Sequence, residues 1–149
     1  MITVAVSKIK LVRESNHRYE IEGRKISSPQ KAVDIINAVL DLENEAQEVL
    51  AEIILDNKHK VAGVMEISRG SVCASISHPR EVFRGAILHN GAAIILFHCH
   101  PSGEVEPSEE DISVTKAIKN SGRILNIPLL DHIIVGDGRF CSLKDKGYL

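Results

Sequence analysis

The sequence predicts an α/β domain in which helices pack on the faces of a mixed β-sheet. Residues 29–40 carry apolar side chains at helical spacing, and residues 92–97 form an apolar run of strand length. Residues 49–67 read as two strands joined by a short turn. Helical and strand segments therefore alternate along the chain, while some strands are joined by hairpin-length turns. This combination is typical of a mixed sheet covered by helices.

Length and charge restrict the classes of protein to consider. The chain has 149 residues, which predicts a single domain over residues 1–149. Its formal net charge of −2 comes from interspersed signs, without the basic block of a nucleic-acid-binding protein. Three Phe and two Tyr are too few to suggest a platform on which bases stack. We therefore expect no direct nucleic-acid partner.

The cysteines, the N-terminal segment and the lengths of the apolar runs indicate the cellular compartment of the protein. No apolar run approaches the ~18 residues of a membrane span. The first residues, MITVAVSKIKLV, are interrupted by lysines and lack a small-residue cleavage site, so they do not read as a signal peptide. Cys73, Cys99 and Cys141 are scattered and odd in number, which favours a reducing compartment. We expect a cytoplasmic protein with no membrane association.

The N-terminal part of the chain predicts strands followed by a helix. Residues 2–24 are rich in β-branched and apolar side chains, with turn residues at Asn16 and His17. Ser28 and Pro29 then form a capping pair that opens a helix. The apolar face of this helix comprises Ala32, Ile35, Ile36, Val39 and Leu40. Residues 43–47 are polar and fit either a loop or the end of the helix.

A hairpin and a second helix follow. The turn at residues 56–59 separates strand-like residues 49–55 from residues 61–67, and one more short strand fits near Val72. Residues 77–79 open the second helix, which ends before Gly91. Its apolar face comprises Val82, Phe83, Ala86 and Ile87.

The C-terminal half alternates strand, helix and strand. The buried strand at residues 92–97 leads directly to His98. After a polar loop, Ser108 caps a third helix. The apolar face of that helix comprises Val114, Ala117, Ile118, Ser121 and Leu125. Residues 129–135 and 140–143 read as strands around a glycine-rich turn.

Two histidines and an aspartate form a candidate metal site. Strand side chains alternate, so His98 and His100 point to the same side, with Cα atoms about 6.6 Å apart. Asp111 lies in the first turn of the third helix and can supply an oxygen ligand. Three such ligands leave the fourth position of a tetrahedral zinc ion open, as in catalytic sites. A water molecule bound there would lose a proton near neutral pH.

Simpler interpretations of these residues remain open. A His-x-His sequence on its own is most often incidental. Ser108 and Asp111 also match a capping box, in which the aspartate accepts a hydrogen bond from the backbone at the start of the helix.

The full spacing is more specific than its parts. The order His-x-His, seven residues, Ser, two residues, Asp resembles the JAMM motif of the JAB/MPN-domain metallopeptidases. The match is closest to the RadC-like branch, in which Pro-Ser-Gly follows the histidines. Residues 77–81 and 130–136 also resemble that branch, and the resemblance spans about residues 47–142. Residues 1–40 add the N-terminal strands and helix, without a counterpart of the helix-hairpin-helix segment that often precedes this domain.

The resemblance implies a fold, an activity and site residues. The fold would be JAB/MPN-like, an architecture shared with cytidine deaminases. The activity would be that of a zinc metallopeptidase or isopeptidase, in which zinc-bound water attacks an amide carbonyl of a peptide or isopeptide substrate. His98, His100 and Asp111 would be the zinc ligands, and Ser108 would orient water or stabilise the oxyanion. Glu48 matches the place of the family's glutamate and would be the general base.

Several neighbouring residues leave alternatives open. Glu52 and Glu66 compete with Glu48 as the base, although for both we favour a solvated surface carboxylate. Cys99 stands where RadC-like sequences usually have asparagine. Strand alternation favours a small buried residue there, whereas a thiolate beside zinc would quench hydrolysis. His132 fits a hydrogen-bonded core histidine better than a partner of a zinc ligand.

Other functions fit less well. A nucleobase deaminase requires H-x-E and P-C-x-x-C, which are missing from this sequence. A two-metal phosphoesterase would need a further cluster of Asp and His residues. The remaining alternative is a non-catalytic, metal-containing module associated with DNA repair or partner binding. Substrate and oligomeric state are not predicted.

Overall fold

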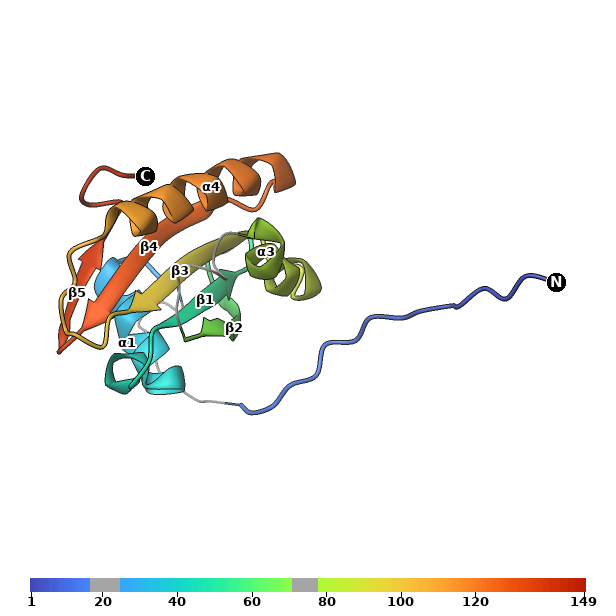
Figure 1. Cartoon of the computed structure of the whole chain (residues 1–149), viewed down its shortest axis with the longest axis horizontal. Helices are drawn as coiled ribbons and strands as arrows, with labels where there is room; N and C mark the ends of the chain where they lie inside the picture. The colour runs from blue at the N-terminus through green and yellow to red at the C-terminus, as the bar shows by residue number, and fades with distance from the viewer. Residues whose placement is uncertain (17–24, 71–77) are drawn as a thin grey trace.

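The computed structural model describes residues 1–16, 25–70 and 78–149 (Figure 1). The helices of these residues are α1 (Pro29–Leu40), the 3-10 helix η2 (Leu42–Asn44), α3 (Pro79–Leu88) and α4 (Glu109–Leu125). The strands are β1 (Val49–Leu55), β2 (Val61–Arg69), β3 (Ala93–Cys99), β4 (Leu129–Gly136) and β5 (Arg139–Ser142).

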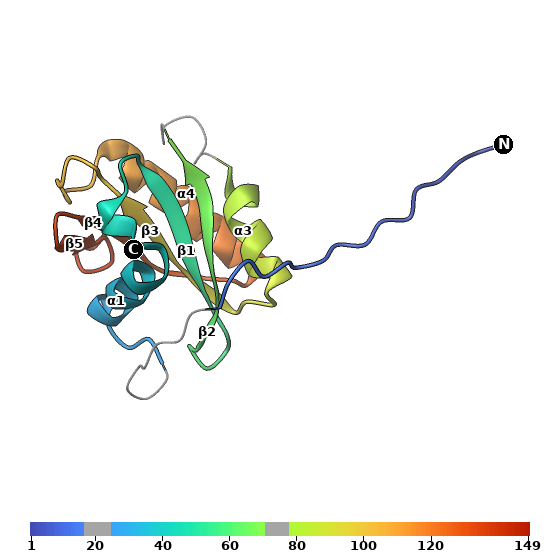
Figure 2. The ribbon, with the colours of Figure 1, turned by 90° about the horizontal axis from the view of Figure 1, so that it is seen from below.

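Within the described residues the strands form one mixed sheet in the order β2-β1-β3-β4-β5. Strand β1 pairs antiparallel with both β2 and β3, β3 and β4 are parallel, and β4 and β5 are antiparallel. Helix α4 connects the two parallel strands. The predicted fold class, a mixed sheet with helices packed on its faces, is confirmed (Figures 1 and 2).

Strand alternation divides the core between the two faces of the sheet. Helix α1 covers one face, where its buried residues pack against Ile53, Phe97 and Cys99. Helices α3 and α4 cover the other face, against Leu50 and Leu96. Since successive strand residues point to opposite faces, His98 belongs to the same face as Leu96 and therefore to the side of α4.

Capping residues and apolar patterns in the sequence predict most of the helices and strands correctly. The Ser28 side chain accepts a hydrogen bond from the Lys31 amide at the start of α1, and Ser108 caps α4. The predicted hairpin of β1 and β2 is present, as are α3 and the strands β3, β4 and β5. Residues 43 and 44 of the polar segment 43–47 belong to the 3-10 helix η2, and the remaining three lie outside it. The first residue of this helix, Leu42, has a buried side chain.

The strand predicted over residues 2–24 is wrong for residues 2–16, which have no regular structure. Their apolar side chains, including Val4, Val6 and Ile9, are exposed, and the segment extends away from the domain (Figure 1). β-propensity measures how well a side chain fits a paired strand, and no described strand pairs with this segment.

Two other predictions lie outside the described residues. They are the turn at His17 with the strand after it, and the short strand near Val72. Among the described helices, none is long and apolar enough to cross a membrane.

Candidate metal centre

The two histidines lie at the C-terminal end of strand β3. His98 is the penultimate residue of the strand, and His100 follows it. Their rings lie on the same side, as strand alternation predicts, with centroids 4.6 Å apart in an edge-to-face arrangement. His98 is buried between the sheet and α4, whereas His100 lies nearer the surface.

Asp111 reaches this site from the first turn of α4. The amide and the hydroxyl of Ser108 both donate hydrogen bonds to Oδ2 of Asp111, at 2.8 Å each. The Asp111 amide donates in return to the Ser108 hydroxyl, at 3.1 Å. The capping box is therefore present, and it also fixes the aspartate side chain. Oδ1 lies 3.0 Å from Nδ1 of His98, and Oδ2 lies 3.5 Å from Nε2 of His100.

These separations fit one small cation. Zinc binds nitrogen and carboxylate oxygen at about 2.0–2.2 Å, so two ligand atoms of a tetrahedral site lie roughly 3.3 Å apart. The 3.0 Å and 3.5 Å separations bracket that value. Both ring nitrogens of His98 are buried and have no aligned hydrogen-bond partner among the described residues, although Nδ1 lies close to Asp111. The two histidines and Asp111 are therefore close enough to be candidate ligands of one cation.

The charges of the site are coupled. Burial raises the pKa of Asp111, but its contacts with His100, His98 and Ser108 outweigh burial and hold that pKa far below the usual value. Asp111 in turn raises the pKa of His100. Nδ1 of His100 lies 2.6 Å from the Glu104 carbonyl, so it carries a proton and donates it. Nε2 of His100 is thereby directed toward Asp111, in the orientation that a metal ligand requires.

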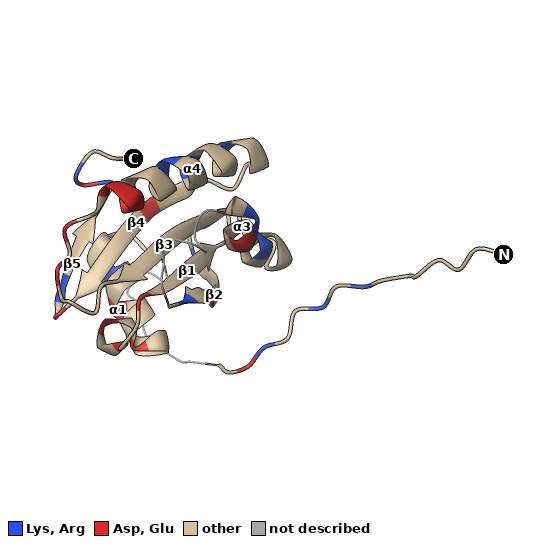
Figure 3. Cartoon of the chain, viewed as in Figure 1, with Lys and Arg blue, Asp and Glu red and all other residues tan. Residues whose placement is uncertain are grey.

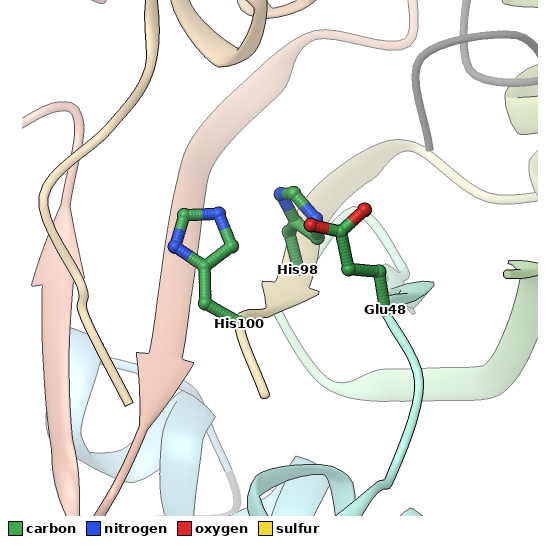
Figure 4. Close-up of side chains that lie close together, drawn as sticks. All are labelled: Glu48, His98 and His100. Carbon is green, nitrogen blue, oxygen red and sulfur yellow. The ribbon is translucent and has the colours of Figure 1, made fainter. Parts of the chain in front are cut away.

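Glu48 completes the cluster from the segment that enters β1. One ligand atom each from Glu48, His98 and His100 lie within 4.8 Å of one another (Figure 4). A pocket of about 540 Å³ opens above them. Its lining comprises Glu48, His98, His100, Pro101, Ser102, Ser108, Glu110, Asp111, Ser113 and Val114. The pocket lining thus includes the three predicted ligands, Ser108 and the preferred base Glu48, but neither of the competing bases Glu52 and Glu66.

Similarity to known proteins is consistent with this arrangement. The model of the RadC-like JAB domain family matches residues 26–148. This chain belongs to the RadC-like JAB domain family. A UPF0758 protein of Methanosarcina mazei is 41% identical over 140 residues, which cover 94% of this chain and 60% of that protein. A UPF0758 protein of Clostridium perfringens is 47% identical over 131 residues, covering 87% and 56%. The UPF0758 protein ABC2615 of Shouchella clausii is 44% identical over 140 residues, covering 94% and 60%.

The RadC-like domain of this chain therefore spans between 56% and 60% of the length of these three relatives. All three carry the name UPF0758, which states no activity.

Glu52 of this RadC-like domain does not lie on the surface, and that prediction is wrong. Its side chain is fully buried in the centre of β1, and neither carboxylate oxygen has a partner among the described residues. Burial raises the pKa of Glu52 to about 8. It contacts the position of Gly85 on α3, where a Cβ atom would lie only 2.5 Å from Oε1. The prediction of a surface carboxylate is confirmed for Glu66, which is exposed and forms an ion pair with Arg69.

Cys99 points away from the metal centre. Its sulfur accepts a hydrogen bond from the Val49 amide at 3.2 Å and donates one to the Gln47 carbonyl at 3.3 Å. The thiol packs in the core on the α1 face, and burial raises its pKa. The interpretation as a small buried residue is confirmed, and the position of the sulfur separates it from the candidate ligands.

His132 lies beside the site on strand β4. It is buried, and its Nδ1 atom lies 2.7 Å from the hydroxyl of Thr115 on α4. Its ring lies 6.3 Å from that of His98, with 22° between the ring planes. Thr115 is not among the site residues predicted from the sequence. The available signal was a threonine four residues after Asp111, beside the apolar face of the predicted helix.

Proposed function

We propose that this domain is a zinc-dependent hydrolase that cleaves a peptide or isopeptide bond. The proposal depends on one observation above all: Asp111 lies 3.0 Å from His98 and 3.5 Å from His100, in the lining of a pocket that also includes Glu48. Two imidazoles and a carboxylate are the ligand types of catalytic zinc sites. The membership in the RadC-like JAB domain family supports the same chemistry.

A bound zinc ion would supply a Lewis acid and make water in its open position more acidic. The residues of the chain then have distinct tasks. His98, His100 and Asp111 hold the metal, and Ser108 holds Asp111 through two hydrogen bonds. Because the Ser108 hydroxyl already donates to Asp111, contact with an oxyanion would require that hydroxyl to rotate.

Glu48 lines the pocket and would move the proton. Hydrolysis joins the oxygen of water to the amide carbon and breaks the bond from that carbon to nitrogen. Glu48 would accept the proton that water loses and transfer it to the leaving nitrogen. The pocket is partly open to solvent, and we propose that the substrate peptide enters there.

The substitution Glu48→Gln separates the base from the ligands. Glutamine has the size of glutamate but cannot accept the proton, so zinc content should remain while the cleavage rate falls about 10²–10⁴-fold. A peptide-library screen with wild-type protein would first supply a substrate. Glu66→Gln is the matched control, since that carboxylate is exposed and paired with Arg69. Normal cleavage by the Glu48 variant would show that the base has been misassigned.

The charge distribution supports the further proposal that the domain does not bind nucleic acid directly. Lys and Arg residues are scattered over the described surface, and acidic residues gather at the start of α4 beside the pocket (Figure 3). Affinity for phosphates normally requires a concentrated positive surface. A sub-micromolar complex with DNA that weakens steeply with salt would contradict this proposal and favour the non-catalytic alternative.

A further inference from the structure

His132 is a core residue beside the candidate site whose hydrogen bonding the proposed reaction leaves unexplained. It lies on the α4 face of the sheet, paired with Leu96 of β3 and two residue pairs along the ladder from His98. Its Nε2 atom is buried and has no partner in the described part of the chain. A buried acceptor without a partner destabilises the folded protein. Such a group calls for a structural explanation.

The hydroxyl of Thr115 determines which nitrogen of His132 carries the proton. The Thr115 oxygen lies 2.6 Å from the Asp111 carbonyl oxygen, and two oxygens approach so closely only with a hydrogen between them. Thr115 therefore donates its single hydroxyl hydrogen to that carbonyl. Nδ1 of His132, 2.7 Å from the same hydroxyl, must then donate to it. Nε2 of a neutral His132 is left with a free lone pair.

His98 needs a hydrogen-bond acceptor for its Nε2 atom when it binds a metal. Its Nδ1 atom faces Asp111 and is the nitrogen that a metal would take. Once Nδ1 binds a metal, Nε2 must carry the proton, and that atom is buried without a hydrogen-bond partner among the described residues. Histidines that bind metals almost always donate their other N–H to an acceptor, which fixes the ring.

We propose that Nε2 of His132 accepts this hydrogen bond from Nε2 of His98 when the site holds its metal. His132 is then a positioning residue, and the inference rests on the metal site proposed above. The 6.3 Å between ring centroids exceeds the roughly 5 Å of a direct N–H···N bond, so a small ring movement on metal binding completes the contact. The same histidine, through Thr115, holds the first turn of α4 that carries Asp111.

The competing acceptor is Glu48, whose carboxylate lies within 4.8 Å of a His98 nitrogen. We favour His132 because its Nε2 atom is as deeply buried as Nε2 of His98, whereas Glu48 is only half-buried at the pocket. The two possibilities make opposite predictions for substitutions at these positions.

Nitrogen-15 NMR of the histidine rings in the full chain, with zinc alone added, tests the proposal. Zinc-free protein should contain His132 as the Nδ1–H tautomer. Zinc-loaded protein should have His98 with zinc on Nδ1 and a slowly exchanging proton on Nε2. This proton should exchange rapidly in His132→Phe and remain protected in Glu48→Met, whose side chain has no comparable acceptor. The reverse pattern would assign the bond to Glu48 and overturn the proposal.

Zinc affinity gives a second readout without any substrate. Loss of such an acceptor typically weakens metal binding about 10–100-fold, which we expect for His132→Phe. His132→Gln, whose carbonyl oxygen can accept the same bond, should recover most of that loss. A folded His132→Phe protein that binds zinc as tightly as wild type would contradict the proposal while leaving the metal site intact. If wild-type protein binds no zinc at all, the metal site itself is wrong, and the role of His132 fails with it.

Discussion

Asp111 connects the helix α4 to strand β3 through a contact of 3.0 Å between its Oδ1 atom and Nδ1 of His98. Its other oxygen accepts two hydrogen bonds from Ser108, which begin the helix. Asp111 therefore has two roles. It belongs to the capping box of α4, and it also completes the candidate metal centre. The two interpretations of the Ser108-x-x-Asp111 pattern are compatible: Oδ1 faces His98, while Oδ2 accepts the bonds from Ser108 and still lies 3.5 Å from His100.

This dual role predicts the behaviour of Asp111→Asn. The amide oxygen of asparagine can still accept hydrogen bonds from Ser108, so the helix should persist. A neutral amide is a much weaker zinc ligand than a carboxylate, so metal and activity should be lost together. Metal analysis and circular dichroism of the same preparation provide the measurement. Asp34→Asn, on the exposed side of α1, is the control. Full zinc content in the Asp111 variant would remove this residue from the ligand set.

The buried carboxyl of Glu52 predicts a pH-dependent stability. Burial raises its pKa to about 8 in the folded protein, from an ordinary value of 4.5. The folded state therefore holds a proton that the unfolded state releases, and stability should fall as pH rises from about 4.5 to 8. At pH 7 the cost is on the order of 3 kcal/mol.

Substitution of Glu52 by Met, which has a similar unbranched shape, should remove this cost. The variant should gain more stability over wild type at pH 8 than at pH 5, as urea unfolding at both values would show. Glu66→Met is the control, because that side chain is exposed and ion-paired. An equal gain at both pH values would contradict the assignment of the effect to ionisation.

Cys99→Ala tests whether the thiol takes part in the metal site. The sulfur bonds to the backbone of residues 47 and 49 on the opposite face of the sheet. Zinc content should therefore be unchanged, while the free energy of unfolding should fall by about 1–2 kcal/mol through lost packing and hydrogen bonds. Chemical denaturation and metal analysis are both needed. A marked loss of zinc would place the thiol at the metal.

Much of the fold could be predicted because its signals are local. The capping residues Ser28 and Ser108 mark the starts of two helices, and the apolar run before His98 marks the buried central strand. Residues 2–16 carried an equally clear strand pattern and form no strand. Pairing depends on a partner edge elsewhere in the molecule, which propensity does not encode.

The candidate site could be predicted in part for the same reason. The spacing of His98, His100 and Asp111 is short and fixed by one strand and one helix cap. The burial of Glu52 was missed, because a charged residue within a strand usually faces water. Only the helix α3, whose Gly85 makes room for the carboxylate, reveals that this one does not. The Thr115–His132 contact joins residues 17 positions apart, so no local pattern indicates it.

Zinc content tests the central claim most directly. Wild-type protein equilibrated with zinc and freed of excess metal should contain about one zinc ion per chain, as a site with three protein ligands requires. The double variant His98→Ala/His100→Ala should contain essentially none, while circular dichroism confirms that it is folded. Full retention of zinc by the folded double variant would contradict the metal centre described above.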